Sequence, residues 1–216
     1  MNLVRFTLMS TVTGTAVVLL TACGGLLPKP MAAPTQYALE APMPRPTSTV
    51  GGRMPLTIIV SPPRPAAGYD SARIVYQRAS HRLEHFAHND WVDTPARMVA
   101  PLIVAALDAS GAFRAVVSAP GPVNGELRLD TEILRLQQDF GSVPSQARFT
   151  LRATLVDSAT RRVLAWREFD TAADSASENP AGGVQAANRA VQAALGSLAG
   201  FCADAARSWQ PPGAKP

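Results

Sequence analysis

The sequence predicts one α/β domain of the α+β type, in which a mixed, mostly antiparallel sheet has two helices packed on one face. Three observations predict this fold class. Apolar residues make up 47% and charged residues 17% of the 216 positions, which supports a single buried core. Short β-branched runs with alternating polarity recur along the chain. Two stretches carry apolar residues at helical spacing, so the expected order of elements is β-β-β-β-α-β-β-β-β-α.

The first 22 residues have the features of an export signal ahead of this domain. Arg5 supplies a positive charge, and the apolar stretch from Phe6 to Leu20 contains no charged residue. That stretch is too short, and too rich in threonine, serine and glycine, to span a bilayer. Residues 1–22 are therefore predicted to be a signal peptide that is removed.

The end of this signal, Leu20-Thr21-Ala22-Cys23-Gly24, resembles the lipobox of bacterial lipoproteins. The resemblance implies cleavage between Ala22 and Cys23, an S-diacylglycerol on the Cys23 sulfur and an N-palmitoyl group on the new amine. Three acyl chains would anchor the protein to a membrane, whereas one chain binds only marginally. Gly24 stands where lipoproteins of the inner membrane often carry aspartate, which implies the outer membrane, on its periplasmic side. The alternative is an ordinary secretory signal with an accidental cysteine.

A proline-rich stretch follows the anchor. Residues 23–35 are predicted to be a lipidated, flexible tether, since their prolines favour extended polyproline backbone. The domain itself is expected over residues 36–210. It begins with a short strand at 36–39, and further prolines form a second loose connection before a β-branched strand at 56–60.

A hairpin and the first helix come next. Strands are expected at 73–77 and 82–87. Residues 94–95, Thr-Pro, fit the N-cap and first position of a helix, and Gly111 fits its end. Pro101 falls inside this helix and is expected to kink it or to shift its start.

The second half of the chain is expected to contain four strands and the last helix. The last three strands are predicted to be consecutive and antiparallel, and the four ranges are 113–118, 127–140, 149–155 and 162–170. The apolar positions shift by one residue after Ile133, which predicts a bulge. Residues 171–182 are expected to form a loop. The last helix spans Val184 to Trp209, with Cys202 on its apolar stripe.

One motif suggests metal chemistry. Residues 81–85, His-Arg-Leu-Glu-His, match the H-x-x-E-H pattern of inverted zinc peptidases. That chemistry needs a helix, on which both histidines project from one face, and a third, acidic ligand. In the strand expected here, His81 and His85 lie about 13 Å apart, too far to share an ion. The sequence therefore favours structural histidines, and neither a metal nor another cofactor is expected.

Other function classes leave no pattern in the sequence. Gly-x-Ser-x-Gly and the glycine-rich phosphate-binding motifs do not occur, so an enzyme is not expected. The 20 lysines and arginines exceed the 16 acidic residues by only four and are dispersed, with no run longer than Arg161-Arg162. Nucleic acid is therefore not an expected partner.

Three motifs carry a family resemblance. They are Arg-Ile-Val-Tyr at 73–76, Trp91 ahead of Thr-Pro-Ala-Arg at 94–97, and Gln-Asp-Phe at 138–140. In this order, over about residues 36–205, the chain resembles the ABC-type transport auxiliary lipoprotein family, the PqiC-like proteins. The resemblance implies a non-enzymatic component of a system that moves phospholipid or other hydrophobic molecules across the cell envelope. The partners it implies are a mammalian-cell-entry (MCE) domain protein and the associated permease and ATPase.

Two further questions are left open by the sequence. Trp91, Asp93 and Arg97, at the start of the first helix, are expected to contribute to a contact surface for a partner protein; alternatively, Trp91 caps the core. The function has an alternative as well, a structural or assembly lipoprotein of the outer membrane without a direct role in transport. A homo-oligomer is compatible with either function.

Overall fold

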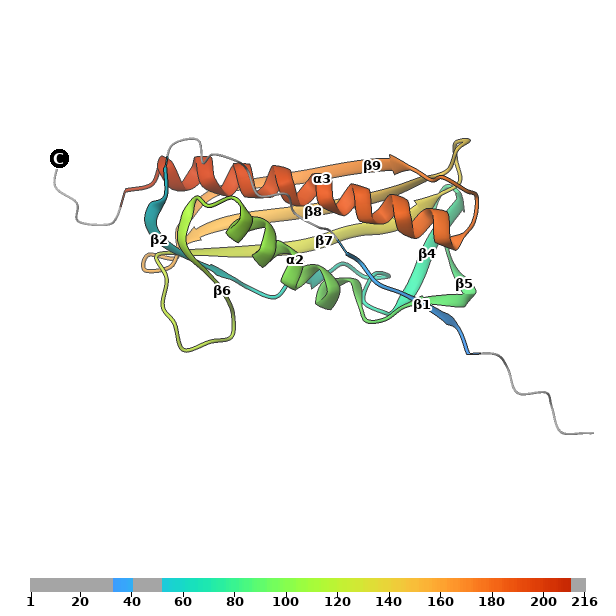
Figure 1. Cartoon of the computed structure of the whole chain (residues 1–216), viewed down its shortest axis with the longest axis horizontal. Coiled ribbons are helices and arrows are strands. Elements are labelled where there is room, and N and C mark those ends of the chain that lie inside the picture. The colour runs from blue at the N-terminus through green and yellow to red at the C-terminus, as the bar shows by residue number, and fades with distance from the viewer. Residues whose placement is uncertain (1–32, 41–51, 211–216) are drawn as a thin grey trace, which may run out of the picture. The chain divides into compact units, whose positions relative to one another are not determined.

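A long antiparallel meander forms the centre of the domain. In the computed structural model, which describes residues 33–40 and 52–210, it consists of β7 (Leu127–Asp139), β8 (Gln146–Asp157) and β9 (Val163–Asp174). These strands belong to one nine-stranded mixed sheet (Figure 1). The predicted succession of three antiparallel strands is confirmed, as is the mixed sheet of the predicted fold class.

Three shorter strands pair in parallel with the other edge of β7, one after another. They are β2 (Met54–Val60), β3 (Arg64–Pro65) and β4 (Arg73–Ala79). Pro62 and Pro63 separate the first two, because proline has no N–H to donate to a sheet ladder. These three strands together line most of the length of β7, with one interruption between β2 and β3 and another between β3 and β4.

The two ends of the sheet are completed by strands from distant parts of the chain. At one end β6 (Phe113–Ser118) pairs in parallel with β2. At the other end β5 (Arg82–Trp91) forms the predicted hairpin with β4, and β1 (Thr35–Tyr37) pairs in parallel with β5. Beyond β1, Leu39 is buried and the Glu40 N–H donates to Asn188 Oδ1, which fixes this first segment to the last helix.

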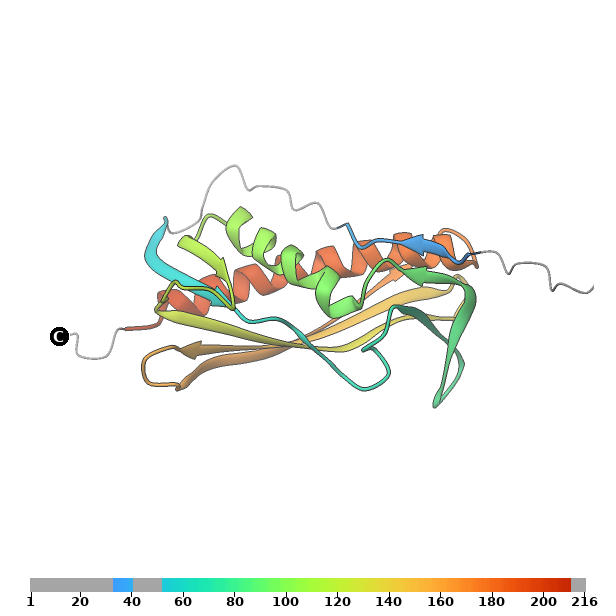
Figure 2. The ribbon, with the colours of Figure 1, turned by 90° about the horizontal axis from the view of Figure 1, so that it is seen from below.

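Both helices lie on one face of the sheet, as predicted. They are α2 (Pro95–Ala109) and α3 (Pro180–Arg207), and α3 crosses β7, β8 and β9 while α2 lies beside it (Figure 2). The inward residues of β8, Phe149, Leu151, Ala153 and Leu155, are fully buried against this helix layer. Truncating a buried leucine of this kind to alanine typically costs about 2–5 kcal/mol, so this layer provides much of the stability of the domain.

The first helix begins where the Thr94-Pro95 pair predicts. The helix begins at Pro95 and continues through Pro101 to Ala109, so its start is not shifted. Pro101 is exposed, and the Arg97 carbonyl four residues earlier therefore loses its helical partner on the solvent side, where water can replace it. Thr94 is the N-cap as predicted, although its side chain makes no capping hydrogen bond.

The structure also tests two other predictions, the bulge after Ile133 and the loop at 171–182. The predicted bulge in β7 is confirmed, because the register with β8 shifts between Ile133 and Arg135. The predicted loop at 171–182 is wrong: β9 continues to Asp174, and α3 begins at Pro180. The small residues 171–173 give a weak strand signal, and it is their pairing with residues 147–149 of β8 that makes them a strand.

Candidate functional site

The predicted lipid anchor lies outside the described residues. Cys23, the cleavage position after Ala22 and most of the tether precede residue 33. Lipidation of Cys23 therefore stays a prediction from the sequence. Within the described part of the chain, Cys202 is a free cysteine, and burial raises the pKa of its thiol to about 12, so it is an inert core residue.

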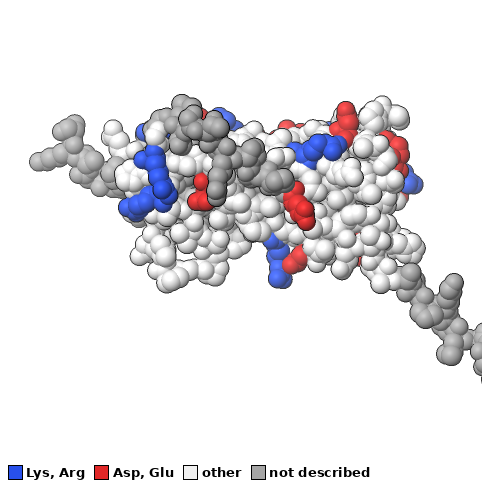
Figure 3. Space-filling model, in the orientation of Figure 1, with Lys and Arg blue, Asp and Glu red and all other residues white. Residues whose placement is uncertain are grey.

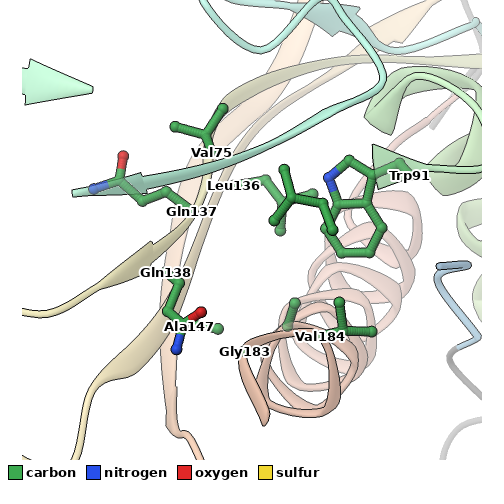
Figure 4. Close-up of a pocket in the computed structure, with 10 residues that line it drawn as sticks. Val75, Trp91, Leu136, Gln137, Gln138, Ala147, Gly183 and Val184 are labelled. Carbon is green, nitrogen blue, oxygen red and sulfur yellow. The ribbon is translucent and has the colours of Figure 1, made fainter. Parts of the chain in front are cut away.

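Trp91 lies in the core. It ends β5, its side chain is 3% exposed, and it borders a small cavity together with Leu136 and Val184 (Figure 4). A side chain in this position offers no surface to another protein. Of the two interpretations of Trp91, the structure favours the one in which it caps the core.

Asp93 and Arg97 lie at the surface, at the start of α2. Arg97 Nε is 3.0 Å from Asp93 Oδ2, and Asp93 Oδ1 accepts a hydrogen bond from the Thr94 N–H. Arg97 is 77% exposed, and neighbouring Val92 is 51% exposed. An exposed ion pair of this kind contributes only about 0–1 kcal/mol to the free energy of unfolding. The fold therefore depends little on these residues, and they are available to contact a partner protein.

The histidine motif lies in the β4–β5 hairpin and not on a helix. His81 occupies the turn with a positive φ of 63°, and His85 lies on β5. Between them, Glu84 accepts hydrogen bonds from the Tyr76 hydroxyl at 2.9 Å and from Arg82 at 2.8 Å. The bond from Tyr76 is the main cause of the lowered pKa of Glu84. Over residues 33–40 and 52–210, no group of three His, Cys, Asp or Glu side chains is placed to hold a metal ion.

A small cavity lies where the start of α3 meets the sheet (Figure 4). Its volume is about 10 Å³, which leaves room for one water molecule at most and none for an acyl chain. Beside it, the buried Gln138 Nε2 donates to Ser145 Oγ at 2.9 Å and to Ser175 Oγ at 3.4 Å. Gly183 faces the Gln138 amide so closely that an added Cβ would lie 2.1 Å from Gln138 Oε1. This is a structural joint between helix and sheet.

A second joint lies at the opposite end of α3. The side chain of Asp157 accepts hydrogen bonds from the Ala159 and Thr160 N–H groups, each at 2.9 Å, and from Trp209 Nε1 at 2.9 Å. Asp157 is buried, and the bond from the Thr160 N–H is the main cause of its lowered pKa. One carboxylate therefore holds both the β8–β9 turn and the tryptophan that follows the helix.

Two open hollows flank Trp209. One, of about 510 Å³, is lined by Met54, Pro55 and Leu56 of β2, by Glu126 and by the end of α3. The other, of about 790 Å³, lies between Arg162–Ala165 and the residues Ala205, Ser208, Trp209 and Gln210. Both fall in the size range of sites that bind small molecules or peptide side chains. We define this region as the Trp209 site.

The sequence pattern did not identify the Trp209 site. Trp209 is the last residue of the predicted apolar stripe, and the stripe alone places it in the core. The strands that form the walls of the site are remote from Trp209 in the sequence, since β2 begins at Met54 and β9 at Val163. Asp157, the partner of the indole, follows a strand in the sequence, where solvated carboxylates are usual, and only the structure shows that it is buried.

Charged side chains on the outer face of the meander are mostly paired. Arg152 contacts both Glu132 and Glu168 at 3.2 Å, and Arg148 contacts Asp170 at 3.0 Å. On the face that carries α2 and α3, the visible surface has few charged residues (Figure 3). None of the helices in the described ranges has both the length and the hydropathy that crossing a bilayer requires.

Comparisons with known proteins identify the family. The model of the ABC-type transport auxiliary lipoprotein component family matches residues 37–199. The crystal structure of protein XCC0632 from Xanthomonas campestris is similar, with a TM-score of 0.72 and 24% identity over 80% of this chain and 97% of that chain. An uncharacterised protein of known structure is similar with a TM-score of 0.61 and 13% identity, over 79% of this chain and 99% of that one. No curated protein matches in sequence. The chain belongs to the family of ABC-type transport auxiliary lipoprotein components.

Proposed function

We propose that the protein is a lipid-anchored accessory component of an ABC transport system that contains an MCE-domain protein. In this role it faces the periplasm from the outer membrane and assists the movement of phospholipid or other hydrophobic molecules across the envelope. The observation that carries the proposal is the family match over residues 37–199, which spans nearly the whole described domain. The lipobox-like sequence that ends at Cys23 supports the anchor.

The arrangement of the domain supports a binding role over a catalytic one. Two buried polar residues with several partners, Gln138 and Asp157, hold secondary-structure elements together, and the cavity beside Gln138 has a volume of only about 10 Å³. Two open surfaces among the described residues are the Trp209 site and the start of α2. Such a domain is suited to docking on a partner that carries the lipid itself.

The tether supports docking at a distance from the membrane. If residues 24–34, which precede β1, are extended at about 3.1 Å per residue, they reach about 34 Å. The anchor and the docking surface can then act at separate positions in the periplasm. Asp93 and Arg97 stay candidate contact residues on this surface.

Co-purification from the source organism tests the proposal. The full chain with a C-terminal affinity tag is extracted with mild detergent, and the proteins that accompany it are identified and quantified. We expect an MCE-domain protein, its permease and its ATPase in comparable amounts. Recovery with cell-wall assembly proteins and without these three would favour the structural alternative and contradict the transport role.

A further inference from the structure

The first half of β9 is an open sheet edge. β9 pairs with β8, and within the described ranges no strand pairs with its other edge. In its second half, α3 contacts the strand directly: the Thr171 hydroxyl donates to the Ala190 carbonyl at 2.9 Å and Arg189 donates to the Asp174 carbonyl. In the first half, by contrast, Val163 is 53% and Trp166 67% exposed. We call residues 163–168 the β9 edge.

The larger hollow of the Trp209 site runs along this edge. It is lined by four consecutive residues, Arg162 to Ala165. Val163 to Ala165 begin β9, whose edge away from β8 has no partner strand within the described residues, so the hollow adjoins unpaired main chain. Trp209 forms the opposite wall and is held there by Asp157. The hollow therefore presents main-chain groups on one side and an apolar ring on the other.

Cationic side chains without acidic partners gather at this edge. Arg161, Arg162 and Arg167 form no ion pair in the described part of the chain, whereas Arg148 and Arg152 on the adjacent strand are paired with Asp and Glu. The Arg167 guanidinium lies over the Phe201 ring of α3, 5.0 Å from its centroid. A strand bound beside β9 would pass all three cations.

From this geometry we propose that the β9 edge binds an extended, acidic segment of a partner polypeptide as an additional strand. Main-chain hydrogen bonds to β9 supply affinity, and carboxylates opposite Arg162 and Arg167 supply specificity. Apolar side chains of the segment contact Trp166 on the outer face and Trp209 in the hollow. The assignment of this segment to a component of the transport system rests on the proposed function; the chemistry of the edge does not.

A second copy of this chain fits the edge less well. Two copies paired through the same edge would bring both sets of three arginines together, and like charges facing each other are unfavourable. The register shift between Leu155 and Val156, which places a bulge in β9 at Leu164, also makes the edge irregular. Bulges and inward charges are features by which natural edges avoid unselective pairing. The segment that binds must therefore match the arginines.

Site-specific photo-cross-linking in the source organism tests this. A photo-reactive amino acid replaces Val163 in the full-length, lipid-anchored chain, and the cross-linked peptide is sequenced by mass spectrometry. A matched control carries the same group at Val143, a 93% exposed valine in the β7–β8 loop. A second comparison adds Arg162→Glu and Arg167→Glu, with Arg64→Glu as the control for charge reversal at an exposed arginine. Circular dichroism and thermal unfolding establish that each variant folds.

We expect the Val163 position to cross-link to a peptide of another protein that contains at least two acidic residues. The yield should fall at least about fivefold in the Arg162→Glu, Arg167→Glu variant, a loss of binding free energy of about 1 kcal/mol. In Arg64→Glu the yield should be unchanged. No cross-link above the Val143 control, a cross-link to a second copy of this chain, or a yield insensitive to charge reversal in a folded variant would overturn the inference. An acidic partner from outside the transport system would support this edge and count against the proposed function.

Discussion

Asp157 shows how a single carboxylate determines the shape of the Trp209 site. Its side chain accepts two backbone N–H groups of the β8–β9 turn and the indole N–H of Trp209. Because all three donors favour the ionised form, the pKa of Asp157 lies below its ordinary value of 3.8. Ionised Asp157 therefore stabilises the folded protein at neutral pH and, through Trp209, keeps the two hollows apart.

Replacing Asp157 with asparagine should destabilise the protein in a pH-dependent way. A lowered carboxyl pKa contributes stability that is complete above the unfolded-state pKa and is lost as the pH falls through the folded-state value. The wild type should therefore be more stable than Asp157→Asn at neutral pH, and the difference should shrink below the ordinary carboxyl pKa. Urea unfolding followed by tryptophan fluorescence measures this.

The exposed Asp108, on α2, offers the control for that experiment. Asp108→Asn should unfold at nearly the wild-type urea concentration at both pH values. If Asp157→Asn and wild type differ by the same amount at neutral and acidic pH, the charge of Asp157 has no stabilising role.

At the scale of the elements, the sequence pattern predicts best where one strand face is buried. The alternation in β8 identifies its inward residues, and all four are buried. β3, Arg64–Pro65, is too short to leave a pattern and exists because it pairs with Glu132 and Ile133 of β7. The end of β9 and the start of α3 depend on contacts between distant segments in the same way. The Trp209 site has walls from three such segments, which is why no local motif marks it.

The docking of α3 gives a prediction at this scale. Gly183→Ala should destabilise the protein by about 1–3 kcal/mol, since its Cβ would overlap the Gln138 amide, which is buried and bonded to two serines. Gly196 lies on the same helix with nothing within 4 Å of an added Cβ. Gly196→Ala should therefore be stabilising, by up to about 1 kcal/mol, through helix propensity.

Denaturant unfolding of both glycine variants distinguishes docking from propensity. Equal stabilisation of the two would mean that the start of α3 does not pack against Gln138 as described. Loss of stability in both would mean that Gly196, too, packs closely against another part of the folded chain.

At the scale of the whole molecule, the sequence predicts a signal, a tether and a domain with different physical roles. The family resemblance seen in three short motifs is confirmed by the match over residues 37–199. That match concerns the domain, whereas the proposed site of action rests on the anchor predicted at Cys23. In the proposed function, the anchor predicted at Cys23 brings the two docking surfaces, the start of α2 and the β9 edge, to the membrane.

The anchor gives the prediction at this scale. Cys23→Ala should leave the folded domain intact, because the domain begins about a dozen residues later. If Cys23 carries the predicted acyl chains, the variant should move from the membrane to the soluble fraction of the cell envelope, because it loses that attachment. Fractionation with the wild type as the reference measures the change.

The intact mass of the mature chain purified from membranes tests the account most directly. We predict a polypeptide that begins at Cys23 and carries the added masses of one diacylglycerol and one palmitoyl group. An unmodified chain, or one still carrying residues 1–22 and recovered without detergent, would contradict a lipid-anchored transport component.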